Sequence, residues 1–298
     1  MARDFEEHRG APCASPARVK PPGTLSVVAT PLGDARDLSP RAAEALRAAD
    51  LVVAEDTRSA RRLLAEVGAE RKPVISCFDA NEAARAAEVG ARLADGANVA
   101  LVSEAGTPLV SDPGYRVVAA AISAGARVVP VPGPSAVLAA LVGAGLPTDR
   151  FLFLGFPPRK SGARRRLFAG VQALPYTLVF YESPLRTAAT LLDLAAVLGG
   201  ARRACVAREL TKPHEEFVRD SLDALAARYA DDRPLGEVTL VVAGASDGAA
   251  VDLDDDEIRE RAAELIAAGQ STGGAARELA TLTGRPRRAI YNLISRSA

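Results

Sequence analysis

The chain has few of the residues from which metal clusters and disulfides are built. Its 298 residues include only two histidines, His8 and His214, and three cysteines, Cys13, Cys77 and Cys205, without CxxC spacing. Ligands this few and this scattered argue against structural zinc, and the odd cysteine count fits a reducing compartment. A Ser-His-Asp triad is poorly supported for the same reason.

Nucleotide-binding fingerprints and membrane signals are missing too. No GxGxxG follows the first predicted strand and no GxxxxGK[ST] occurs, which leaves a dinucleotide site unsupported and excludes a P-loop. No apolar run has the length of a membrane-spanning helix, and the N-terminus lacks the pattern of a signal peptide. Lys and Arg number 37, as do Asp and Glu, so any RNA contact must come from a local basic patch. We therefore expect a cytoplasmic protein without membrane contacts.

The first half of the chain alternates short apolar segments with helix-like segments. Strands are predicted at 24–30, 51–54, 74–77, 99–102 and 127–131. Between them, Ser39, Thr57 and Ser135 are expected to cap helices. This alternation predicts a parallel sheet with right-handed crossovers, so the loops that follow the strands should meet at one edge.

Four of those loops carry constrained or polar residues: 31–33, 55–58, 103–114 and 132–135. The longest reads SEAGTPLVSDPG, in which two prolines restrict the backbone and two glycines permit close approach. Acids, hydroxyls and carbonyls dominate over lysine, a lining that suits a neutral or cationic ligand. A nucleoside sulfonium is one ligand of this kind, although the lining alone does not select it. The alternative is that the long loop is only an elaborate connection whose acids cap helices.

A second α/β region and a small helical region are predicted to follow. Strands are expected at 151–156, 177–181, 204–207 and 237–243, and three short helices resembling a helix-turn-helix at 252–298. The predicted organisation is a disordered leader at 1–22, α/β domains at 23–147 and 148–247, and the helical domain at 252–298.

The densest basic run of the chain is PPRKSGARRR at 157–166. It has no acid within it, so we expect its cations to contact an RNA backbone, with a solvated loop and helix start as the alternative. The predicted RNA-binding residues in this run are Arg159, Lys160, Arg164, Arg165 and Arg166.

Eight segments in order resemble the tetrapyrrole methylase superfamily of S-adenosylmethionine-dependent enzymes: TPLGD, AEDTR, SEAGTPLVSDPG, PVPGPSA, FLGFPPRK, FYESPLR, RELTK and GEVTLVV. AEDTR, FYESP and RELTK resemble in particular the branch that methylates a cytidine ribose 2′-oxygen in the decoding region of 16S ribosomal RNA. The resemblance implies two α/β/α domains of the class III methyltransferase type, with S-adenosylmethionine in the cleft between them. It also implies a homodimer that acts on 16S rRNA in the small ribosomal subunit.

The resemblance also implies a set of donor-binding residues. They are Pro31, Leu32, Gly33, Glu104, Ala105, Gly106, Thr107, Ser135, Ala136, Tyr181, Leu210 and Val238. The chain departs from the family pattern at Glu104, where aspartate is usual, at Asp34 in place of asparagine, and at the Phe78–Asn81 stretch. The extra methylene of Glu104 moves its carboxylate by about 1.5 Å, enough to turn a direct contact into a water-mediated one.

The implied reaction is an in-line attack of a ribose 2′-oxygen on the donor methyl, helped mostly by alignment and exclusion of water. Candidates to accept the proton or assist its loss are Lys212, Glu182 and Asp56, while Arg58 is a candidate phosphate contact. A salt bridge or helix cap is the alternative for each. Two rival functions remain. One is a methyltransferase that acts on a small molecule or a protein, and the other is a non-catalytic ribosome-binding protein in which Glu104 prevents donor binding.

Overall fold

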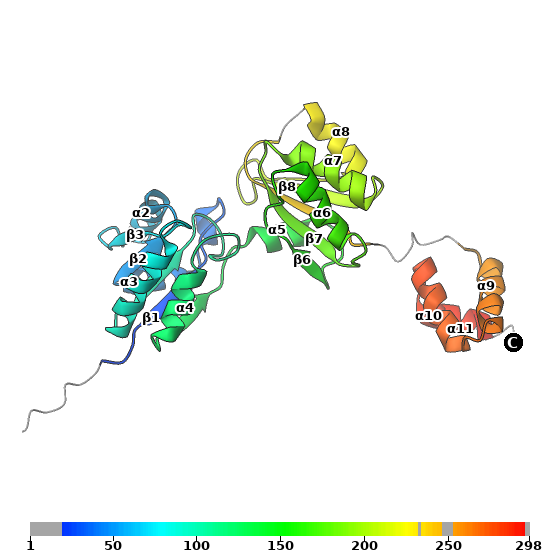
Figure 1. The fold of residues 1–298 in the computed structure, drawn as a ribbon, viewed down its shortest axis with the longest axis horizontal. Helices are drawn as coiled ribbons and strands as arrows, with labels where there is room; N and C mark the ends of the chain where they lie inside the picture. Colours follow the sequence, from blue (N-terminus) through cyan, green and yellow to red (C-terminus); the bar gives the residue numbers. More distant parts are fainter. Residues whose placement is uncertain (1–19, 232–233, 246–252, 296–298) are drawn as a thin grey trace, which may run out of the picture. The chain divides into compact units, whose positions relative to one another are not determined.

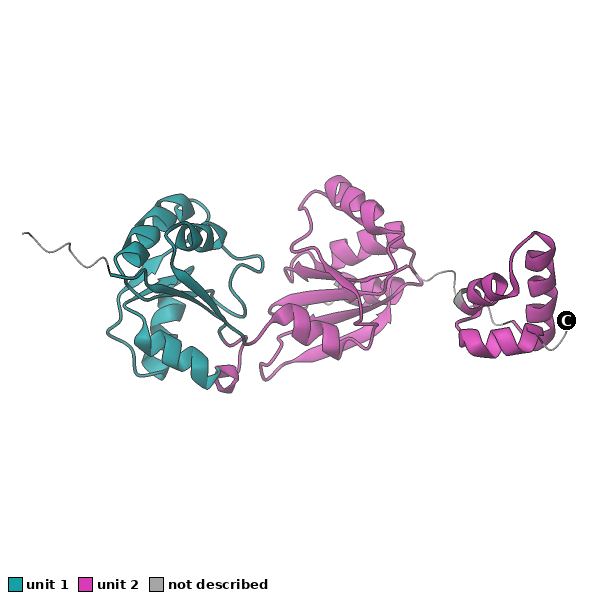
Figure 2. Cartoon of the chain, turned by 90° about the horizontal axis from the view of Figure 1, so that it is seen from below, with its two compact units in different colours: residues 1–30, 39–132 teal, residues 31–38, 133–298 magenta. Residues whose placement is uncertain are grey.

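The computed structural model describes residues 20–231, 234–245 and 253–295, so the predicted leader lies almost wholly outside the described residues. The chain divides into two compact units, coloured separately in Figure 2: unit 1 comprises residues 1–30 and 39–132, and unit 2 comprises residues 31–38 and 133–298. The boundary set by compactness thus falls at residue 132, whereas the division predicted from the sequence falls at 147. The short segment 31–38 belongs to unit 2 although its neighbours on both sides belong to unit 1.

Unit 1 is built on a five-stranded sheet in the order β3-β2-β4-β1-β5. Its strands are β1 (Thr24–Val28), β2 (Leu51–Ala54), β3 (Val74–Ser76), β4 (Val99–Val102) and β5 (Arg127–Val131). Every pairing among them is parallel, which confirms the predicted sheet. Strands β2 and β4 are buried at all positions, as continuous apolar strands covered on both faces should be.

Helices cover both faces of this sheet (Figure 2). They are α1 (Pro40–Ala48), α2 (Thr57–Glu66), α3 (Glu82–Ala94) and α4 (Tyr115–Ser123). Ser39 caps α1, because its side chain accepts a hydrogen bond from the amide of Ala42. The expected cap of α2 was wrong by one residue: Asp56 is the N-cap and Thr57 is the first helical residue. An aspartate N-cap serves equally well, since its carboxylate satisfies a free amide of the first turn.

Unit 2 contains a second five-stranded sheet, in the order β6-β7-β10-β8-β9. Its strands are β6 (Phe151–Phe153), β7 (Thr177–Glu182), β8 (Arg203–Arg208), β9 (Glu216–Ser221) and β10 (Val238–Val242). Only β6 and β7 pair in parallel; β10 lies antiparallel between β7 and β8, and β9 pairs antiparallel with β8. The edge strand β9 is absent from the sequence prediction, and β6 is three residues shorter than predicted.

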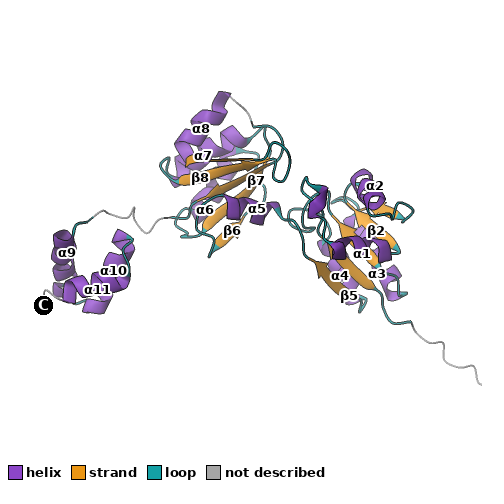
Figure 3. Ribbon diagram, turned by 180° about the vertical axis from the view of Figure 1, so that it is seen from behind, coloured by secondary structure: helices purple, strands orange, loops and turns teal. Residues whose placement is uncertain are grey.

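The helices that accompany this sheet are α5 (Ala136–Gly143), α6 (Ser161–Val171), α7 (Thr187–Leu198) and α8 (Leu222–Asp231), with a short 3-10 helix η1 (Ala35–Asp37) (Figures 1 and 3). Fully buried Phe168 of α6, Leu194 of α7 and Leu225 of α8 share one core with Phe180 of β7. Helix α5 packs against β10 and β7. The side chain of Phe217 in β9 fills the space in which a Cβ at Gly143 would sit.

Three further helices end the described chain, in agreement with the predicted helical region (Figure 3). They are α9 (Asp255–Ala267), α10 (Thr272–Thr283) and α11 (Arg287–Ser295). Asp254 begins α9 in a capping box with Glu257, and Ser271 caps α10. The three helices share a core of their own, to which Ile258, Leu279 and Ile290 contribute.

Candidate functional site

The predicted donor-binding loop of unit 1 lies at the carboxyl-terminal edge of its sheet, beside the end of β1. Thr30, just beyond β1, exchanges two backbone hydrogen bonds with Gly106 of the loop after β4, at N–O distances of 2.8 and 3.0 Å. Gly106 has a φ of +82°, a left-handed conformation that a side chain would oppose. The pairing holds the segment Glu104–Thr107 against the end of β1, as the sheet topology predicts.

The rest of that loop is strained and tied to the neighbouring helix. Leu109 and Ser111 have φ values of +70° and +72°, which non-glycine residues adopt only where the surroundings enforce it. The amide of Gly114, at the start of α4, donates to the Glu82 carboxylate of α3 at 2.8 Å. A backbone held in this way presents its side chains in a fixed arrangement.

Acidic side chains gather around this loop. Burial raises the pKa of Asp112 to about 6, and the negative charges of Glu55 and Glu104 raise it further. A hydrogen bond with Ser103 acts in the opposite direction. Burial also raises the pKa of Glu55, and the charges of Glu104, Asp79 and Asp56 add to it. Among the described residues, the salt bridges include none formed by Glu55, Glu104 or Asp112. Carboxylates that repel one another create a negative potential that a cation relieves.

Asp56 is placed as a helix cap with a low affinity for protons. Its carboxylate accepts hydrogen bonds from the backbone amide of Arg58 at 2.7 Å and from the Arg58 guanidinium at 2.9 Å. These hydrogen bonds lower the pKa of Asp56 to about 2. A carboxylate with so low a pKa is a weak base, so the structure favours the capping alternative over a role in accepting a proton. Arg58 keeps an exposed side chain beside it.

In unit 2, the turn after β1 packs on the loop after β8. The amide of Asp34 donates to the hydroxyl of Thr211 at 3.2 Å, across 177 residues of sequence. A Cβ at Gly33 would lie 2.3 Å from Cγ of Lys212, so only glycine allows this approach. Glu209 and Thr211 have φ values of +50° and +62°, which makes this loop a second strained segment. The predicted donor residues Gly33 and Leu210 are therefore brought into adjacent segments.

Lys212 is held between two carboxylates. Its Nζ donates to Glu209 at 2.9 Å and to Glu237 at 3.3 Å. Burial works to lower the pKa of Lys212, but the hydrogen bond with Glu209 and the charge of Glu237 outweigh it and raise the pKa. Lys212 is therefore a cation at neutral pH, suited to electrostatic assistance and not to accepting a proton.

Glu182 at the end of β7 is turned inward. Its side chain is completely buried and forms a 2.5 Å ion pair with Arg186. The carboxylate also accepts hydrogen bonds from the hydroxyl of Thr190 at 2.6 Å and from the amide of Ser183 at 2.7 Å. These partners occupy both carboxylate oxygens, which favours the salt-bridge alternative for Glu182 over a role in accepting a proton.

The other predicted donor residues of unit 2 lie at the ends of its strands and at the start of α5. Val238 is buried at the start of β10 and pairs in register with Glu182. The Tyr181 ring packs edge-on against Phe153, with centroids 4.9 Å apart. Ser135 occupies the N-cap position of α5, but its side chain makes no capping hydrogen bond, contrary to expectation. Ala136 follows it as the first residue of the helix.

The basic run contains no acid, but Asp193 from another helix pairs with two of its cations. Asp193 of α7, 3% exposed, accepts from Arg164 Nε at 2.8 Å, Arg165 Nε at 2.6 Å and Ser161 Oγ at 3.0 Å. Arg164 is itself only 4% exposed, so it is a structural residue and not a surface cation. The sequence does not indicate this pair, because 29 residues separate Arg164 from Asp193.

The remaining cations of the run stay at the surface. Arg159, Lys160 and Arg166 are exposed, and the salt bridges of the described chain include none of them. Arg165 is paired with Asp193 but has a side chain that is 54% exposed. These four side chains form the basic surface, a name used below for Arg159, Lys160, Arg165 and Arg166. His214 is exposed as well, after the Lys212 loop.

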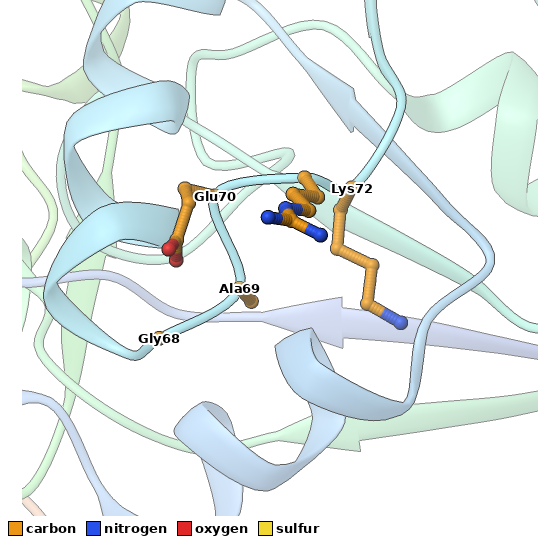
Figure 4. A pocket seen from close by; sticks show the side chains of 5 residues that line it. Gly68, Ala69, Glu70 and Lys72 are labelled. Carbon is orange, nitrogen blue, oxygen red and sulfur yellow. The ribbon is translucent and has the colours of Figure 1, made fainter.

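A surface pocket of about 320 Å³ lies away from the strand-end loops. Its lining comes from the single segment 68–72 between α2 and β3, and Figure 4 shows the Glu70 and Lys72 side chains extending in different directions. The segment precedes β3, so it lies at the amino-terminal edge of the parallel sheet, opposite the predicted donor-binding loops. Within the described ranges, no group of three or more His, Cys, Asp or Glu side chains is arranged to hold a metal ion. No described helix is long and apolar enough to cross a bilayer.

The chain is similar to known proteins along most of its length. A family model described as Tetrapyrrole (Corrin/Porphyrin) Methylases matches residues 24–226. A Mycobacterium bovis protein named ribosomal RNA small subunit methyltransferase I is 47% identical over 280 residues, covering 92% of this chain and 95% of that protein. A Xylella fastidiosa (strain Temecula1) protein of the same name is 46% identical over 272 residues, covering 91% and 98%.

A solved structure shares the fold at low sequence identity. The uroporphyrin-III C-methyltransferase from Thermus thermophilus, complexed with S-adenosyl homocysteine, is 19% identical and has a TM-score of 0.52. The match covers 74% of this chain and 97% of that chain. The likeness concerns the fold alone.

Proposed function

This chain belongs to the tetrapyrrole (corrin/porphyrin) methylase family, and we propose that it transfers a methyl group from S-adenosylmethionine to small-subunit ribosomal RNA. The support comes from relatives that carry this activity in their names and align along nearly the whole of both chains. The finer proposal is that the acceptor is the ribose 2′-oxygen of a cytidine in the decoding region of 16S rRNA. It is supported by the segments AEDTR, FYESP and RELTK.

The observation that carries the donor proposal is the backbone pairing of Thr30 with Gly106. It holds the segment Glu104–Thr107, to which the resemblance assigns donor contacts, against the residue that precedes Pro31. The methyl donor supplies an electrophilic methyl group on a positively charged sulfur. The negative potential of Glu55, Glu104 and Asp112 fits such a cation, and Glu104 retains the charge of the aspartate that is usual at its position.

In unit 2, the proposed donor contacts come from the tightly packed loops around Gly33 and Leu210 and from Tyr181 and Val238. The lack of a side chain at Gly33 lets the turn pack closely on Lys212, which holds it against the loop that carries Leu210. Lys212, fixed by Glu209 and Glu237, provides a positive charge beside the same turn. We assign it electrostatic stabilisation of the ribose oxygen as that oxygen loses its proton.

The proposed chemistry forms a bond between the ribose 2′-oxygen and the methyl carbon, breaks the carbon–sulfur bond, and releases the hydroxyl proton. Asp56 and Lys212 are unsuited to take that proton, since one has a pKa of about 2 and the other is a stable cation. Alignment of the two reactants therefore carries most of the rate enhancement in this proposal, and the proton leaves to water or to a carboxylate with a raised pKa.

The basic surface of unit 2 is proposed to hold the RNA backbone. Cations that neutralise phosphates release condensed counterions, which makes binding depend on salt. We further propose that the enzyme is a cytoplasmic homodimer and that its substrate is the assembled small ribosomal subunit. The evenly balanced charge of the chain, 37 basic and 37 acidic residues, means that RNA binding depends on this local surface.

The decisive experiment is incubation of the purified protein and labelled S-adenosylmethionine with small ribosomal subunits that lack the ribose methylation. The RNA is then digested and its nucleosides are identified by mass spectrometry. A new 2′-O-methylcytidine is the expected product. If calorimetry shows donor binding but the RNA is not methylated, the ribosomal proposal is overturned and a tetrapyrrole or protein substrate is favoured. RNA binding without donor binding would favour a non-catalytic ribosome-binding protein.

A further inference from the structure

Phe156 is an exposed aromatic residue three positions before Arg159, the first cation of the basic surface. The strand predicted at 151–156 ends at Phe153, because Gly155 has a φ of +61° and turns the chain out of the sheet. The amide of Tyr181 donates to the Gly155 carbonyl at 3.0 Å and fixes that turn. Phe156, the next residue, is 56% exposed, so more than half of its surface can contact a ligand.

The Phe156 ring packs on Tyr181, which in turn packs on Phe153. The centroids of Phe156 and Tyr181 are 5.5 Å apart at an interplanar angle of 56°. Tyr181 in turn packs against Phe153 with centroids 4.9 Å apart. Tilted and edge-on contacts of this kind are favourable and directional, so they fix the orientation of each ring. More than half of Phe156 remains for contact with another planar group.

Two buried ion pairs anchor the backbone that follows Phe156. Arg186, paired with Glu182, donates from Nη1 to the carbonyl oxygen of Pro157 at 3.1 Å. Arg164, paired with Asp193, donates to the carbonyl oxygen two residues further on, at 3.3 Å. The segment is therefore ordered before any ligand arrives, which reduces the entropy lost on binding. This anchoring gives the buried charges of Glu182 and Arg164 a positioning role.

We propose that Phe156, Arg159 and Lys160 form a binding subsite for one unpaired nucleotide of the RNA. The base stacks on the Phe156 ring and the adjoining phosphate contacts the two cations. Stacking on an aromatic side chain suits any base, and proteins read RNA mostly where bases are unpaired. An acidic peptide would satisfy the cations but would leave the ring without a planar partner. The inference rests on the proposed function, because it names how that RNA substrate is held.

The absence of tryptophan from this chain offers a direct test. F156W places a single fluorophore in the subsite, and L192W places one on α7 at a residue of nearly equal exposure, 55%. Titration with a short single-stranded RNA should quench the fluorescence of F156W to saturation, and that of L192W should change little. Equal quenching of both variants, or none in F156W while the RNA binds, would overturn the subsite.

Affinity measurements separate stacking from charge. F156L retains apolar contact with Tyr181 but lacks a ring, so the affinity for single-stranded RNA should fall roughly 5- to 100-fold. F156Y should bind as the unmodified protein does. The salt dependence of binding should be unchanged in F156L, whereas K160A should lower its slope by about 1.

The two proposals fail in different ways. If the unmodified protein methylates small subunits while F156L binds RNA equally well, the subsite is wrong and the proposed function stands. If the unmodified protein methylates no RNA in any form, the proposed function is wrong whatever Phe156 does.

Discussion

The carboxylates at the strand ends cluster together in one sheet and pair with cations in the other. At the edge of the unit 1 sheet, the carboxylates of Glu55, Glu104 and Asp112 repel one another, and none of them enters a salt bridge of the described chain. In unit 2, Glu182 and Glu209 each face a cation, in pairs of 2.5 and 2.9 Å. Similar residues at similar places in two α/β units thus have different electrostatic environments.

The difference indicates two uses of charge. An ion pair fixes the position of its loop because both members are satisfied within the protein. Carboxylates without a cationic partner lower the stability of the folded unit and leave an attraction that an external cation can satisfy. We therefore interpret the paired charges of unit 2 as structural, and the clustered acids of unit 1 as part of the donor-binding machinery.

The largest effect is expected from removal of a buried partner in unit 2. Asp193→Ala leaves Arg164 buried without its counter-ion, which should lower the free energy of unfolding by about 3–5 kcal/mol. Denaturant unfolding followed by circular dichroism measures the loss. The matched control is Glu88→Ala, which breaks pairs of Arg85 and Arg92 whose side chains are 33% and 52% exposed, and should cost about 1 kcal/mol or less. Equal losses in the two variants would contradict the structural interpretation of the buried pair.

The parallel sheet of unit 1 could be predicted because its information is local. Each strand is a short apolar run, and Ser39 marks the next helix by its own side chain. The edge strand β9 could not be found in this way, since its residues are half-buried or exposed and its pairing with β8 defines it. The short β6 was overextended because the apolar pattern of 151–156 continues through the turn at Gly155.

The candidate site shows the same limit. The loops after β1 and β4 could be expected to meet, because parallel strands end at a common edge, and Thr30 and Gly106 do so. The burial of Arg164 could not be expected, because its partner Asp193 lies on a different helix. The environment of a side chain depends on contacts across the fold. Residue types alone therefore cannot distinguish a buried, paired arginine from an exposed one. The proposed donor and RNA contacts stay predictions.

A smaller effect should separate backbone strain from donor binding in unit 1. Gly106→Ala and Gly68→Ala both place a side chain in the left-handed region, at φ values of +82° and +70°. Each should lower the free energy of unfolding by roughly 1–2 kcal/mol. A Cβ at Gly68 meets nothing within 4 Å, so this variant reports the cost of the backbone conformation alone. Only Gly106→Ala should also weaken binding of S-adenosylmethionine, as measured by calorimetry. Equal donor affinity in both variants would remove the Gly106 loop from the donor site.

The most subtle test concerns the sign of a pH dependence. The pKa of Asp112 is raised to about 6 from an ordinary value of 3.8, so the folded state holds this proton where the unfolded state has lost it. Stability must therefore fall as the pH rises from about 4 to 6. Asp56 has the opposite sign, because its pKa is lowered to about 2 and its contribution is lost as the pH falls from about 4 to 2.

Asp112→Asn should consequently unfold at a higher temperature than the unmodified protein at pH 7 and at a similar temperature near pH 4. Asp56→Asn should show the reverse trend, with lower stability at pH 7. Thermal unfolding between about pH 2 and pH 7 measures both variants. A saturating concentration of S-adenosylmethionine should reduce the gain from Asp112→Asn, because a bound cation compensates the repulsion that the substitution removes. If the gain is unchanged by the donor, the acidic cluster of unit 1 does not face the sulfonium, and its charges serve another purpose than the one assigned here.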